Sequence, residues 1–116
     1  MILLFNVEFC FNAFGASKWT YLGKEDGYID KYDKKTIKKI DANIMEVYTI
    51  NTMGSATNKT QLRANCNTHN VALGSTFDLR NENWNFVYDY SKTGWRWYSP
   101  TSRTEKKLSA IICTGR

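Results

Sequence analysis

Two cysteines, Cys66 and Cys113, constrain this chain more strongly than any other feature of its sequence. No other cysteine follows the N-terminal segment. The third one, Cys10, lies in an apolar stretch over residues 2–14 that ends near Gly15 in a small-residue site, as in a cleavable export signal. Cleavage there would remove Cys10 and leave an even pair in an oxidising compartment. The sequence therefore predicts a disulfide between Cys66 and Cys113.

We expect residues 1–15 to be a signal peptide, truncated at its start if basic residues precede Met1, and residues 16–116 to form a single domain. No lysine or arginine precedes the apolar stretch, and a few upstream basic residues would complete the signal. The alternative is an apolar N-terminal strand of a cytosolic protein. A transmembrane helix needs about 20 apolar residues, so we expect no membrane span here.

The predicted disulfide would contribute much of the stability of so small a domain. Closing the loop from Cys66 to Cys113 removes unfolded-chain entropy worth about 4 kcal/mol. The whole free energy of unfolding of a typical domain is about 5–15 kcal/mol. A chain of 116 residues buries a modest core, so such a brace is valuable.

Apolar and polar side chains alternate along much of the chain, which is the pattern of half-buried strands. Leu62, Ala64 and Cys66 share one face of such a strand. The polar connections at 41–43 and 81–83 are too short for parallel crossovers, so we expect an antiparallel meander of about six strands. The expected extended segments are 19–22, 28–30, 44–50, 61–67, 71–79, 84–90 and 95–98.

The periodicity changes after Pro100 and predicts a C-terminal helix. Ser102 and Glu105 have the spacing of a capping box, in which the serine hydroxyl accepts a hydrogen bond from a first-turn amide. An apolar stripe then follows at i, i+3 and i+4. Its members are Leu108, Ile111 and Ile112.

Cys113 falls in the last turn of this helix, so the disulfide would hold the helix against the strand that carries Cys66. The predicted fold class is therefore α+β, an antiparallel β-meander with one C-terminal helix pinned by a disulfide.

Several short motifs follow one another through nearly all of residues 16–116. They are Trp19, residues 28–30, 36–39, 47–50, 62–66 and 97–102, and Cys113. In this order and spacing the chain resembles the surface-adhesin E family, small exported proteins of Gram-negative bacteria. The resemblance implies an antiparallel sheet with a C-terminal helix held by one disulfide. The best-known member of that family is a surface adhesin that binds host matrix and serum proteins such as vitronectin and laminin.

The chain differs from that family pattern in two places. It has no lipid-attachment motif, and Tyr48 stands where relatives often carry tryptophan. Adhesion is therefore one of several functions that the resemblance implies.

Positive charge is the strongest candidate feature for binding. The formal net charge is +5, which favours anionic partners. We expect the densest group of lysines to lie in a turn between the segments at 28–30 and 44–50, and the alternative is a solvated turn that prevents edge-to-edge sheet pairing. The candidate residues are Lys31, Lys34, Lys35, Lys38 and Lys39.

Aromatic side chains, concentrated over residues 84–98, are the second candidate. Exposed Trp and Tyr side chains are common interface anchors, and core packing is the alternative for most of them. Trp95 and Arg96, beside Gly94, are the pair that we expect to be exposed.

The sequence offers no catalytic constellation, cofactor motif or metal site. His69 is the only histidine, and with two paired cysteines it does not supply a zinc-ligand set. We expect it to lie at a strand edge.

The functional hypothesis is an exported, non-enzymatic binding domain, an adhesin for host extracellular-matrix or serum proteins. The alternative is a small periplasmic structural or accessory domain of an envelope complex. The expected partners are thus a host protein or an envelope protein, with acidic polysaccharide as a further candidate and no nucleic acid. The expected location is the periplasm, the cell surface or the medium.

Overall fold

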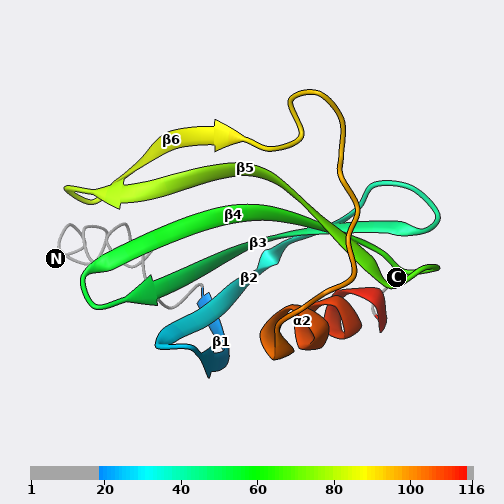
Figure 1. Cartoon of the computed structure of the whole chain (residues 1–116), viewed down its shortest axis with the longest axis horizontal. Helices are drawn as coiled ribbons and strands as arrows, with labels where there is room; N and C mark the ends of the chain where they lie inside the picture. The colour runs from blue at the N-terminus through cyan, green and yellow to red at the C-terminus, as the bar shows by residue number, and fades with distance from the viewer. Residues whose placement is uncertain (1–18, 115–116) are drawn as a thin grey trace, which may run out of the picture.

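The computed structural model describes residues 19–114, and they form one antiparallel sheet with a helix on one of its faces (Figure 1). The sheet has six strands in the order β1-β2-β3-β4-β5-β6, so every strand pairs with its neighbours in sequence. The α+β meander predicted from the sequence is confirmed. The predicted signal peptide at 1–15 lies outside the described residues. The elements are β1 (Trp19–Glu25), β2 (Tyr28–Lys39), β3 (Ile44–Met53), β4 (Ala56–Asn65), β5 (Asn70–Arg80), β6 (Asn83–Asp89) and α2 (Arg103–Thr114).

Short turns with left-handed backbone produce the meander. Asp26 and Gly27 connect β1 to β2 with φ of 52° and 84°, and Asn81 and Glu82 connect β5 to β6 with φ of 50° and 67°. Two successive residues with positive φ match the twist of a two-residue hairpin, in which Asp, Asn and Gly are the preferred residues. Each such connection therefore reverses the chain into an antiparallel neighbour.

The core lies between one face of the sheet and α2. Helix α2 packs against β1, β3 and β4. Its apolar stripe contributes Leu108 and Ile112, each 1% exposed, and the sheet contributes alternate residues of its strands. The buried core residues are Leu22, Tyr32, Met45, Val47, Leu62, Ala64, Cys66, Val71, Leu108 and Ile112.

Helix α2 begins at the predicted capping box. The Glu105 amide donates to the Ser102 hydroxyl (3.1 Å), and the Glu105 carboxylate accepts from the Thr101 amide (3.3 Å). A second cap was not visible in the sequence, because it comes from the far end of the chain. The Glu25 carboxylate at the end of β1 accepts from the amides of Arg103 (2.9 Å) and Thr104 (3.3 Å).

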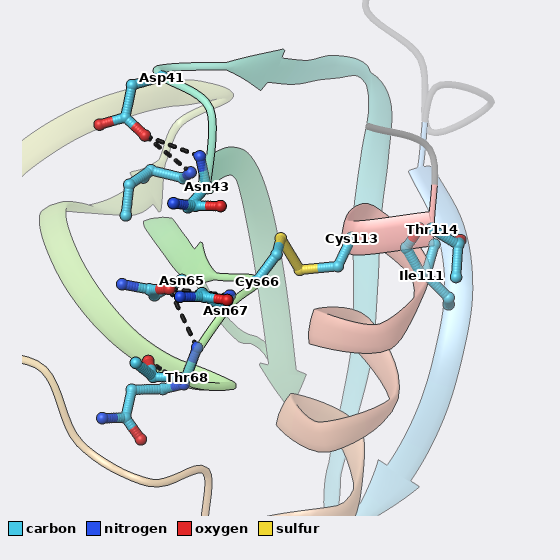
Figure 2. The surroundings of a disulfide bond; sticks show 11 residues. Asp41, Asn43, Asn65, Cys66, Asn67, Thr68, Ile111, Cys113 and Thr114 are labelled. Atoms are coloured by element: carbon cyan, nitrogen blue, oxygen red, sulfur yellow. Dashed lines mark hydrogen bonds between the residues drawn. A yellow bond between two sulfur atoms is a disulfide. The ribbon is translucent and has the colours of Figure 1, made fainter.

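The predicted disulfide joins Cys66, just after β4, to Cys113 in the last turn of α2 (Figure 2). Their Cα atoms are 5.5 Å apart, a normal separation for a disulfide. The Cys66 amide donates to the Asn43 carbonyl (2.7 Å), and the Asn65 side chain accepts from the amides of Asn67 and Thr68 in the following turn. The disulfide therefore joins the helix to a turn that is itself well hydrogen-bonded.

Two predicted segments differ from the structure. The lysine-rich segment is not a turn, because β2 extends through it to Lys39 and pairs with β3 on both sides of a bulge between Asp33 and Lys38. Residues 95–98 do not form a strand. Within them only Tyr98 pairs with the sheet, through a single antiparallel bridge to Val71.

Candidate binding surface

The face of the sheet opposite α2 carries cationic and aromatic side chains side by side. In β3, Glu46 and Tyr48 alternate with core residue Val47, and their partners on neighbouring strands share this face. We call this surface the cation–aromatic face. Its members are Lys31, Lys38, Glu46, Tyr48, Lys59, Gln61, Arg63, Phe77, Trp84 and Trp95.

Three aromatic rings surround the ammonium group of Lys59. The Nζ atom lies 4.7 Å from the ring centre of Trp84, 4.8 Å from that of Phe77 and 5.6 Å from that of Tyr48. These rings come from β6, β5 and β3, and Lys59 lies on β4 between them. Distances within about 6 Å allow cation–π attraction to each ring. Lys59 thus links four strands across this face.

Arg63 occupies a second cluster on the same face. Its Nε donates to the buried Glu46 carboxylate (2.8 Å), which also accepts from the Gln61 amide (3.0 Å). The guanidinium carbon lies 4.1 Å from the ring centre of Trp95. Gly74 makes room for this stack, because a Cβ atom there would lie 2.6 Å from the Trp95 ring and would also meet Gln61.

The structure divides the five predicted lysines between the two sheet faces and the bulge of β2. The register places Lys31 opposite Ile50 and Lys38 opposite Glu46, on the cation–aromatic face. Lys39 lies opposite Met45 and therefore points to the face that carries α2. Lys34 and Lys35 lie within the bulge and are exposed.

Hydrogen bonds hold this bulge in shape. The Asp33 carboxylate accepts from the Lys35 amide (3.0 Å), and the Thr36 hydroxyl donates to the Asp33 carbonyl (2.8 Å). The same hydroxyl accepts from the Tyr48 amide on β3 (2.9 Å). Thr36 therefore takes part in bridging the gap in the β2–β3 ladder while Lys34 and Lys35 remain in solvent.

The side chains of Trp95 and Arg96 lie in different surroundings. Trp95 is half-buried against Arg63, so the prediction that it is exposed is wrong. Arg96 is exposed and lines a shallow depression of about 200 Å³. The aromatic residues of this depression are Tyr88, Tyr90 and Tyr98.

A cleft of about 290 Å³ lies between the sheet and α2, and two of its carboxylates already serve the fold. Glu25 caps α2, and Glu105 accepts from the Tyr98 hydroxyl (2.7 Å). Burial raises the pKa of Tyr98, and the bond to Glu105 raises it further, so the phenol stays protonated. Burial also raises the pKa of Asp30, against the hydrogen bond from Thr104 that lowers it.

Residues 19–114 contain no group of three His, Cys, Asp or Glu side chains placed to hold a metal ion. His69 lies exposed in the turn between β4 and β5 with φ of 68°. Over the same residues, no helix is long and apolar enough to cross a membrane.

Comparison with protein-family models, curated proteins and solved structures finds no match to this chain. The fold and surface define the class of protein as a disulfide-braced α+β domain with a cation–aromatic sheet face. Sequence reasoning missed Lys59 and Arg63 as members of that face. The sequence pattern that could have identified them is the alternation over 58–65, which puts these two side chains and Gln61 on the side of the strand away from Leu62.

Proposed function

We propose that the protein is an exported, non-enzymatic binding domain that attaches to acidic regions of host extracellular-matrix or serum proteins. The observation that carries the proposal is a group of lysines on and beside the β2 bulge, of which Lys31 is half-buried and the others are exposed. We call this group the lysine patch. Its members are Lys31, Lys34, Lys35 and Lys38.

The charges of this patch are available to a partner because two carboxylates on the same sheet face are withdrawn from solvent. Asp33 and Glu46 are both buried, and Glu46 is shared between Arg63 and Lys38. Lys38 lies 4.0 Å from Glu46, yet its side chain is 64% exposed. The surface presented to a macromolecule is therefore cationic.

Lysine is a flexible point charge, and it suits diffuse attraction to acidic surfaces better than bidentate recognition. Such contacts are screened by salt, with a Debye length of about 8 Å at physiological ionic strength. The proposal therefore predicts binding that weakens steeply as salt rises. Acidic polysaccharide offers the same anionic chemistry and is the natural competitor in a binding assay.

Export is supported by the disulfide, because such bonds persist mainly in oxidising compartments. The non-enzymatic character is part of the proposal.

The test is binding of the purified protein to immobilised laminin and vitronectin at salt concentrations from about 50 to 300 mM. The double variant Lys34→Glu/Lys35→Glu should lose binding. The matched control Lys92→Glu/Lys106→Glu changes the net charge equally at two exposed lysines outside β2 and should bind as the wild type does. Equal loss in both variants would mean that only total charge matters, and no binding at low salt would refute the proposal.

The second candidate is a periplasmic accessory domain of an envelope complex. The exposed apolar side chains Phe86, Val87 and Tyr88 on β6 favour it, because they offer a protein-binding surface without charge. Co-purification with an envelope assembly that survives Lys34→Glu/Lys35→Glu would support this candidate over the first.

A further inference from the structure

Within residues 19–114, the outer edge of β6 is a strand edge with little protection. Strand β6 comes last in the sheet and, within residues 19–114, pairs only with β5. An edge strand presents unpaired N–H and C=O groups that can template another strand. Phe86 is 61% exposed, and Val87 and Tyr88 beside it are also exposed. This edge therefore combines free backbone groups with apolar side chains.

The opposite edge of the sheet is protected. Lys107 of α2 donates to the Leu22 carbonyl of β1 (3.0 Å), and Glu25 at the end of β1 binds the first amides of α2. Strand β1 also carries Lys24 and a register shift between Tyr21 and Gly23. Lysines, bulges and covering helices are the usual means of blocking an edge. All three occur at β1.

At β6 these means of blocking a strand edge are nearly absent. The chain has 16 Lys and Arg residues, yet none of them, and no proline, lies between Arg80 and Lys92. Glu82 and Asp89 are the acidic residues in that interval, and neither lies within 83–88. One register shift, at Val87, interrupts the pairing with β5. Residues 83–86 form a regular uncharged run before it.

We propose that this edge pairs with the same edge of a second copy of the chain, in an antiparallel arrangement about a two-fold axis. Residues 83–88 carry no charged side chain, so this edge cannot attract a charged peptide by ion pairs. The same edge of a second copy is equally uncharged and therefore matches it. With the axis perpendicular to the sheet, each face continues into the same face of the partner copy. Trp84 and Phe86 then lie beside the same rings of the second copy, and aromatic cross-strand pairs stabilise a sheet.

The net positive charge does not oppose this pairing. The lysine patch lies on β2, four strands from β6, or about 19 Å at about 4.8 Å per strand. Two such patches in a paired sheet are separated by several Debye lengths, each about 8 Å at physiological ionic strength. Both patches stay available in the dimer, so the inference is independent of the proposed function and either can fail alone.

The test is sedimentation velocity of the protein over concentrations from about 1 to 200 μM, a range that covers weak edge-to-edge association. The wild type should pass from monomer to dimer and no further, because two-fold pairing uses up the edge. Phe86→Lys should raise the dimer midpoint at least about tenfold, since it places like charges across the axis. The matched control is Tyr21→Lys, because Tyr21 on β1 is also 61% exposed, and it should dimerise as the wild type does.

Hydrogen exchange of the wild type gives a second readout that does not depend on the folding of a variant. Amides over 83–89 should exchange more slowly at high protein concentration, whereas those of β1 should not change. A monomer throughout the concentration range would overturn the proposal. So would a dimer that Tyr21→Lys dissociates, an open series of larger oligomers, or exchange over 83–89 that is independent of concentration.

Discussion

Cys66 and Cys113 join the end of β4 to the last turn of α2, so the final element of the chain is tied covalently to the middle of the sheet (Figure 2). Cys66 is itself buried and belongs to the same core cluster as Ala64 and Ile112. The bond therefore acts at the point where the helix and the sheet share their core.

Replacing Cys113 with serine should lower the free energy of unfolding by about 2–5 kcal/mol. The unfolded chain regains the entropy of the open loop, and α2 loses the attachment of its last turn. Thermal melting under non-reducing conditions measures the effect. Reduced wild type should melt close to Cys113→Ser, and a variant that melts like the oxidised wild type would contradict this role of the bond.

Replacing Gly74 with alanine should destabilise the protein by about 1–3 kcal/mol, the usual cost of overpacking. The added Cβ would lie 2.6 Å from the Trp95 ring and would displace it from Arg63. Urea denaturation measures the change. The neighbouring variant Ser75→Ala adds no atoms and should stay within about 0.5 kcal/mol of the wild type. Equal stability of Gly74→Ala and wild type would show that Trp95 does not need this space.

Replacing Lys59 with methionine keeps most of the side-chain stem and removes the cation from the three rings. We expect a loss of about 0.5–2 kcal/mol, the range for cation–π attraction at partly buried sites. The exposed residue Lys92 provides the control, because Lys92→Met should change stability by less than about 0.5 kcal/mol. If the two variants are equally stable in urea, the rings contribute packing alone.

Asp30 should make stability depend on pH. Burial raises the pKa of its carboxyl in the folded state, so the folded protein binds this proton more tightly than the unfolded chain does. Its contribution is present at low pH and is lost as pH rises through the folded-state pKa. Asp30→Asn should therefore be more stable than the wild type at about pH 7, and the difference should shrink toward about pH 3.

Urea denaturation across this pH range measures the Asp30 effect. Glu82→Gln removes an exposed carboxylate in the turn before β6 and should give no such trend. A less stable Asp30→Asn at neutral pH would mean that the hydrogen bond from Thr104 outweighs the cost of burial.

The local part of the fold could be predicted from the sequence. The alternation in β4, the capping box at Ser102 and Glu105, and the pairing of Cys66 with Cys113 each depend on residues close together or on cysteine count, and all three are confirmed. The extent of β2 could not be predicted in this way. Its lysine-rich second half has weak intrinsic strand preference, and pairing with β3 outweighs that preference.

The candidate surface was harder to predict because it depends on register. A single bulge shifts which residues share a face, and β2 has one between Asp33 and Lys38. For that reason Lys31 and Lys38 share a face, although strict alternation along an unbroken strand would put them on opposite faces. The rings around Lys59 come from three strands, so no local pattern brings them together.

The central claim, an exported domain braced by one disulfide, is tested most directly by the intact mass of the protein from its native cells, with and without reduction and thiol blocking. We predict a chain that begins near Ala16 and has no reactive thiol until it is reduced, when two appear. A chain that retains residues 1–15 and has three free thiols would place the protein in a reducing compartment and contradict the account.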